Sequence, residues 1–149
     1  MSDVTAEEAL AKLSLSSVSD LANELAIASD NLNDALREVE EKLAALNLGV
    51  SAAVPLEVGS GWSRSLAFRK EGSKWRLMVD REDTTPEVSF NTSPLMNVSR
   101  EVRCQVAGRL KELYLQIVAN AESQLVGTRQ SLDKTRKFTQ ELVLLRRKS

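Results

Sequence analysis

The sequence predicts an α+β fold in which an antiparallel β-meander of three to four strands, at about 50–90, lies between two long helices. Three patterns predict it: apolar residues seven apart through 17–47, apolar–polar alternation through 64–80, and a second helical pattern through 94–147. A chain of 149 residues is long enough to bury one core. We therefore expect a single domain, 1–149, in which the two long helices pair as an antiparallel coiled-coil-like hairpin.

Two helices are expected before the sheet. A Thr-x-x-Glu spacing typical of a capping box predicts a short helix over 6–13. The longer helix, 17–47, should end at Asn47 and Gly49, since both residue types favour the left-handed backbone that closes a helix. Its apolar residues recur seven apart, which favours a coiled-coil seam. They are Val18, Leu25, Leu32, Val39 and Leu46.

The meander is expected to hold up to four strands. Segments 64–70 and 74–80 alternate between apolar and polar residues and are clear strands. Segment 50–58 contains Pro55, which suits an edge strand or a bulge because proline has no N–H to donate. Segment 86–90 is expected to add a short fourth strand.

The turn between the two clear strands sets their register. We prefer a turn on 72–73 to one a residue earlier, because it places Glu71 opposite Lys74. This register sets Phe68 opposite Leu77. Either turn keeps the apolar residues on one face, whereas a slip by one residue would not. The residues expected under the sheet are Leu66, Phe68, Trp75, Leu77 and Val79.

The last helix is expected to begin at Ser93-Pro94, with serine as N-cap and proline at the first helical position. The pattern then runs through 94–147. Glycines and a phase shift in the apolar residues predict a bend or break near 120–127. Beyond that point the helix is rich in leucine, and we expect it to self-associate. The candidate oligomerisation residues are Leu132, Phe138, Leu142 and Leu145.

The residue types exclude several chemistries. The chain has no histidine, which removes Ser-His-Asp and Cys-His catalysis and zinc sites built on imidazole. No phosphate-binding glycine loop or dinucleotide motif occurs. We therefore expect no enzyme, no metal and no cofactor. The single cysteine, Cys104, excludes an internal disulfide and suits a cytoplasmic protein. Neither a signal peptide nor a membrane-spanning run is expected, and hence no membrane partner.

Charge is distributed unevenly. Residues 1–49 carry a net charge of −7, whereas 62–81 carry +4 and 129–149 carry +5. We expect the oppositely charged first and last segments to lie against each other, in preference to a basic arm for nucleic acid. The basic stretch 62–81 also holds Trp62, which we expect to be an exposed anchor in a loop. The candidate partner-binding residues are Trp62, Arg64, Arg69, Lys74 and Arg76.

These features favour a non-enzymatic protein-binding module that acts as a homo-oligomer, for example an adaptor, a chaperone-like factor or an inhibitor of a larger complex. The alternative is a nucleic-acid-binding accessory protein that uses the Arg, Lys and Trp side chains of the sheet. The order of helix, β-meander and helix in a chain of 149 residues is similar to the layout of prefoldin subunits. That resemblance implies a prefoldin-like chaperone subunit as a further alternative.

Overall fold

The computed structural model describes residues 15–148, so the short helix expected over 6–13 lies outside the described residues. It confirms the α+β class, with long helices towards both ends and an antiparallel sheet between them. By its contacts the chain divides into two compact units, Met1–Val39 and Glu40–Ser149. That both units belong to one domain stays a prediction. The elements are α2 (Leu15–Ala45), β1 (Ala52–Gly59), β2 (Trp62–Glu71), β3 (Lys74–Asp83), β4 (Ser89–Pro94), η1 (Leu95–Asn97), α3 (Arg100–Ala107) and α4 (Leu110–Lys148).

Helix α2 ends as its sequence predicts. Asn47 has a φ of 53° and Gly49 a φ of 66°, so both adopt the left-handed backbone that turns the chain out of the helix. Within 17–39, several apolar side chains of the helix are exposed. They are Val18, Leu21, Leu25 and Ile27. The pairing of α2 with α4 stays a prediction.

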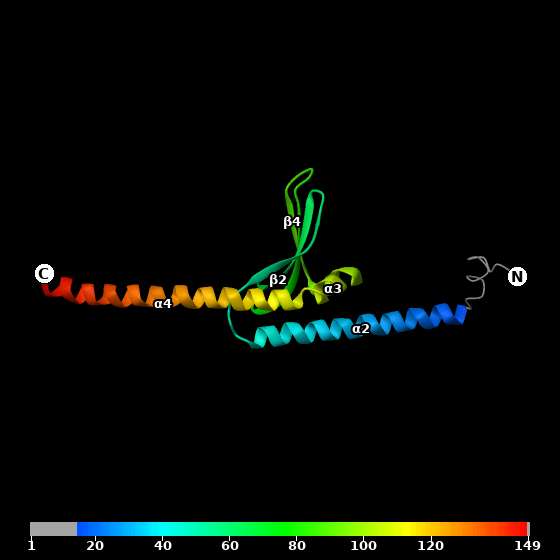
Figure 1. The fold of residues 1–149 in the computed structure, drawn as a ribbon, viewed down its shortest axis with the longest axis horizontal. Coiled ribbons are helices and arrows are strands. Elements are labelled where there is room, and N and C mark those ends of the chain that lie inside the picture. The colour runs from blue at the N-terminus through cyan, green and yellow to red at the C-terminus, as the bar shows by residue number, and fades with distance from the viewer. Residues whose placement is uncertain (1–14, 149) are drawn as a thin grey trace. The chain divides into compact units, whose positions relative to one another are not determined.

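The sheet is a four-stranded meander in the order β1-β2-β3-β4, and every neighbouring pair is antiparallel (Figure 1). The expected register is confirmed, with Phe68 opposite Leu77 and Glu71 opposite Lys74. The two-residue turn begins at Gly72, whose φ of 62° would strain any residue with a side chain. Strands β2 and β3 are longer than expected and extend to Trp62 and Asp83.

The core of the second unit lies under one face of the sheet, which we call the inner face. It carries the buried residues Leu66, Phe68, Leu77 and Val79, as predicted, with Trp75 half-buried and stacked on Phe68. Helices α3 and α4 each bury two apolar residues spaced four apart, which completes this core. These residues are Val102, Val106, Leu113 and Ile117.

The C-terminal helical region begins and breaks at positions other than those expected. Pro94 is extended, with a ψ of 150°, because the segment 89–94 pairs with β3 as a strand. The N-cap of the first α-helix is Ser99, whose side chain accepts a hydrogen bond from Val102 N at 3.3 Å. The interruption falls at Gly108, where α3 ends, and α4 continues without a break through 120–127.

The two edges of the sheet are treated differently. Strand β1 contains Pro55 and a bulge directly after it, where the register with β2 shifts, as an edge strand with proline predicts. On the other side, β4 pairs with β3 only from Met78 onward. The Leu77 N–H therefore lies beyond the end of β4, and it donates to Glu40 Oε2 at 2.9 Å.

Helix α4 has two parts with different surroundings. Its first turns pack on the sheet through Leu113 and Ile117, and Asn120 Nδ2 donates to the Ser51 carbonyl at 2.9 Å. Every residue from 122 to 148 is exposed, and we call this segment the C-terminal arm. In Figure 1 it extends past the sheet, and at ~1.5 Å per residue it is about 40 Å long. Within 15–148, no helix has the length and apolar content to cross a membrane.

Candidate partner-binding site

The candidate residues of the sheet lie on two opposite faces. Because residues paired across an antiparallel ladder share a face, Arg69 and Arg76 stand together on the outer face, and Lys74 shares it. Trp62, Arg64 and Leu66 are alternate residues of β2, so Trp62 and Arg64 share the inner face with Leu66. They lie at the end of the sheet away from the 72–73 turn. The structure therefore separates residues that we expected to act as one basic surface.

On the outer face, Arg69 is held in a compact polar network. Its Nη1 and Nη2 donate to the two Asp80 carboxylate oxygens at 2.6 and 2.8 Å, a bidentate pair. Nη2 also donates to Thr92 Oγ1 at 2.5 Å, and Nε to Glu71 Oε1 at 3.3 Å. Thr92 Oγ1 in turn donates to Asp80 Oδ1 at 2.7 Å. The hydrogen bond to Asp80 is the main reason that the pKa of Arg69 is raised.

The same network explains two buried residues that the sequence did not predict. Ala67 and Met78 face each other in the row between Arg69 and Asp80, and both are buried on the outer face. The Arg69 side chain crosses this row to reach Asp80, so its methylene groups cover the apolar pair. Arg69 is thus a structural residue of the outer face.

Three further cations of the sheet differ from Arg69 in being exposed. Lys70, Lys74 and Arg76 are exposed near the 72–73 turn, and no ion pair is recorded for them within the part of the chain that the structure describes. Over the sheet region as a whole the charges balance, because residues 52–94 hold six basic and six acidic residues and carry no net charge.

Trp62 is not the exposed loop anchor that we expected. It is the first residue of β2, is half-buried, and is covered by two guanidinium groups. The Cζ of Arg64 lies 5.2 Å and that of Arg81 4.7 Å from the indole centroid, which is cation–π distance. The indole also fills the space over Gly59, where an added Cβ would lie 2.1 Å from Trp62 Nε1.

The same two arginines line a groove of about 390 Å³ between the sheet and the start of α3. Its apolar part comes from Val79, Val98 and Val102, and its polar part from residues of β2, β3, β4 and the segment before α3. The polar residues are Arg64, Arg81, Asn91, Thr92, Ser93, Asn97 and Ser99.

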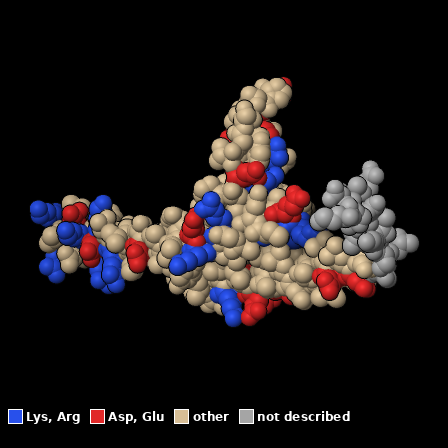
Figure 2. Space-filling model, turned by 45° about the vertical axis from the view of Figure 1, so that its right-hand side comes forward, with Lys and Arg blue, Asp and Glu red and all other residues tan. Residues whose placement is uncertain are grey.

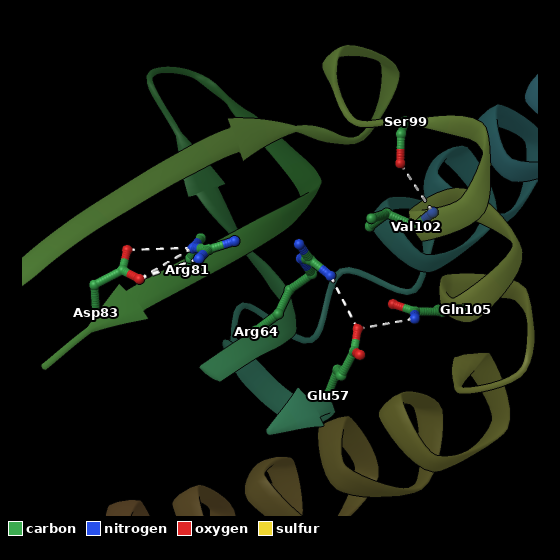
Figure 3. Close-up of polar contacts among 7 residues, drawn as sticks. All are labelled: Glu57, Arg64, Arg81, Asp83, Ser99, Val102 and Gln105. Carbon is green, nitrogen blue, oxygen red and sulfur yellow. Dashed lines mark hydrogen bonds and ion pairs between the residues drawn. The ribbon is translucent and has the colours of Figure 1, made fainter. Parts of the chain in front are cut away.

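The arginines of the groove are anchored by carboxylates at its rim (Figure 3). Arg64 Nη1 donates to Glu57 Oε2 at 3.2 Å, and that oxygen also accepts from Gln105 Nε2 at 3.1 Å. Arg81 donates to Asp83 on its own strand at 3.2 to 3.3 Å. Only Nη1 of Arg64 and only Nε and Nη2 of Arg81 take part in these contacts, so both guanidinium groups keep N–H donors free for a further acceptor.

The predicted oligomerisation residues all lie on the C-terminal arm and are exposed. Leu132, Phe138, Leu142 and Leu145 are between 46% and 61% exposed. The arm is also basic, since 122–148 holds seven basic and three acidic residues, and Figure 2 shows Lys and Arg gathered at the end of α4.

The candidate partner-binding residues did not include Arg81, and sequence reasoning missed the polar residues of β4 and of the segment before α3. Arg81 could have been found from the register of the hairpin. A turn on 72–73 pairs Arg81 with Arg64, on the same face of the sheet as Trp62. The positions of Asn97 and Ser99 in the groove could not be predicted in this way, because they depend on how the chain turns from β4 into α3.

No protein-family model, no curated protein and no solved structure matches the chain.

Proposed function

We propose that this chain is a non-enzymatic protein-binding module that works as a homo-oligomer. The observation that carries the proposal is the C-terminal arm, in which every residue from 122 to 148 is exposed. In proteins, the stability of a helix comes mainly from an apolar face packed on a partner. The exposed leucines of the arm supply such a face.

The partner that fits the arm is the acidic part of α2 in a second copy. Residues 17–39 hold five acidic residues and one basic residue, a net charge of −4, whereas 122–148 carry +4. Both segments have exposed apolar residues, and their helical lengths are similar, about 35 and 40 Å. In a dimer with a two-fold axis, the arm of each copy would pack on α2 of the other, so the same contact would form twice.

The balanced charge of 52–94 is the reason we prefer this function to nucleic-acid binding. Polyanion binding needs a surplus of cations that displace counterions, and the strongest candidate, Arg69, is occupied by Asp80. A prefoldin-like chaperone subunit stays a weaker alternative, because the resemblance is one of arrangement only.

Two leucines of the arm offer a matched test. Leu142 is 49% and Leu144 57% exposed, and they lie about 200° apart around the helix, so Leu144 points away from the face shared by Phe138 and Leu145. Sedimentation equilibrium of the wild type should give a mass above the 16.4 kDa monomer. Leu142→Lys should raise the dissociation constant at least about tenfold, whereas Leu144→Lys should leave it within about twofold.

The salt dependence tests the choice of α2 as partner. Because exposed charges attract less strongly at high ionic strength, association through a −4 and a +4 surface should weaken as NaCl is raised. A wild-type monomer at tens of micromolar, or equal effects of the two lysine variants, would refute the proposal.

A further inference from the structure

We propose that the groove between the sheet and α3 binds an extended acidic segment of a partner protein, with Arg64 and Arg81 as the residues that receive its carboxylates. This inference deepens the proposed function, on which it rests, by naming the chemistry of the partner. It depends on the groove and its residues, whereas the oligomer depends on the C-terminal arm.

The first argument is the state of the two guanidinium groups. Both lie against the face of Trp62, which fixes their planes and lowers the entropy that a ligand must remove on binding. Arg64 uses only Nη1 towards Glu57, and Arg81 uses Nε and Nη2 towards Asp83. Each arginine therefore retains N–H donors for a carboxylate from a ligand.

The second argument is the composition of the walls. Asn91, Ser93 and Asn97 have no recorded hydrogen bond from their side chains among the described residues, so these groups remain to bind polar atoms of a ligand. The groove also runs along β4, an edge strand, whose outer backbone groups can pair with an extended chain. Val79, Val98 and Val102 supply an apolar surface for one uncharged side chain.

The third argument separates an acidic peptide from a nucleic acid. Glu57 and Asp83 stand at the rim and would repel a backbone that carries a charge at every residue. A volume of about 390 Å³ holds a few side chains, and an acidic segment with interspersed apolar residues matches both its arginines and its valines.

The test uses a short fluorescein-labelled peptide in which glutamate alternates with valine, and a control peptide with glutamine in place of glutamate. Fluorescence anisotropy at low salt should show saturable binding of the first peptide only. The double variant Arg64→Gln/Arg81→Gln should weaken that binding at least about tenfold, since it removes two charge-assisted donors. The matched double variant Lys74→Gln/Arg76→Gln removes the same charge elsewhere and should change it less than about twofold.

Two further measurements make the result independent of folding. Amide NMR of the wild-type chain during titration with the acidic peptide should show the largest shifts at Asn91, Asn97 and Ser99. Arg81→Gln alone removes the more exposed arginine, 42% against 18% exposed for Arg64, and should weaken binding by itself.

Several outcomes would overturn the assignment: no saturable binding, equal losses in the two double variants, shifts confined to other surfaces, or tighter binding of a thymidine oligonucleotide than of the peptide. The Leu142→Lys variant separates the two proposals. If this variant is monomeric but still binds the peptide, the groove acts independently of the oligomer. If the wild type forms an oligomer but does not bind the peptide, only the proposal for the groove is refuted.

Discussion

Replacement of Arg69 by alanine should destabilise the chain by about 2 to 3 kcal/mol, an effect that a surface ion pair would not produce. The Arg69 and Asp80 side chains are only 27% and 14% exposed, and their two bonds are short, at 2.6 and 2.8 Å. Loss of the guanidinium leaves the Asp80 carboxylate with Thr92 as its remaining recorded hydrogen-bond partner. It also uncovers Ala67 and Met78.

We place the magnitude below the 3 to 5 kcal/mol typical of a broken buried pair, because both side chains retain some contact with water. Urea unfolding, followed by circular dichroism at fixed protein concentration, should show a midpoint lowered by about 1 to 2 M. The matched control is Arg76→Ala, since Arg76 is paired directly across from Arg69 but has no recorded ion pair among the described residues.

A double-mutant cycle completes this test. If Arg69 and Asp80 act as a unit, Arg69→Ala/Asp80→Ala should cost less than the sum of the two single variants. A loss below about 0.5 kcal/mol for Arg69→Ala, equal to that of Arg76→Ala, would show that the network contributes no more than an exposed pair and that our reasoning is wrong.

Three other changes have defined outcomes. Burial raises the pKa of Asp80, but hydrogen bonds from Arg69 and Thr92 outweigh this effect and hold the pKa below its usual value. The ionised Asp80 therefore stabilises the fold at pH values above its unfolded-state pKa, and this stabilisation is lost as pH falls through its folded-state pKa. The stability difference between the wild type and Asp80→Asn should therefore shrink from about pH 5 to pH 2, and a constant difference would contradict the pairing. Leu113→Ala removes a fully buried side chain and should cost about 2 to 5 kcal/mol by urea unfolding. Gly59→Ala should displace the Trp62 indole and shift its fluorescence emission to longer wavelength, whereas an unchanged spectrum would show that the ring does not lie over Gly59.

The sheet could be predicted to the level of its register, because alternation and turn chemistry act over neighbouring residues. Glu71 opposite Lys74 selected the 72–73 turn, and Gly72 with its φ of 62° is the residue that this turn requires. The end of α2 shortly before Asn47 followed from equally local chemistry.

The misassigned features depend on contacts between segments distant in the sequence. Ser93-Pro94 has the composition of a helix start, but pairing of β4 with β3 holds it extended, and the cap moves to Ser99. The burial of Met78 arises because Arg69 reaches Asp80 across it, which alternation alone cannot indicate.

The candidate site was predictable only in part. Arg64 was named from its charge, yet its surroundings come from Trp62 at the same end of β2, from Arg81 on β3 and from Gln105 on α3. The candidate oligomerisation residues were chosen because the end of the helix is rich in leucine, and they are exposed, but their contact with a partner helix stays a prediction.

Pro55 and the adjacent bulge have a consequence for the state of the protein at high concentration. Exposed strand edges are the usual starting points of fibrils, and the homo-oligomer that we propose would raise the local concentration of such edges. Strand β1 lacks an N–H at Pro55 and is irregular just beyond it, while Glu40 occupies the Leu77 amide where β4 stops. The β1 edge therefore gives little template for stacking, so concentrated solutions should remain free of thioflavin-positive fibres that grow from this edge.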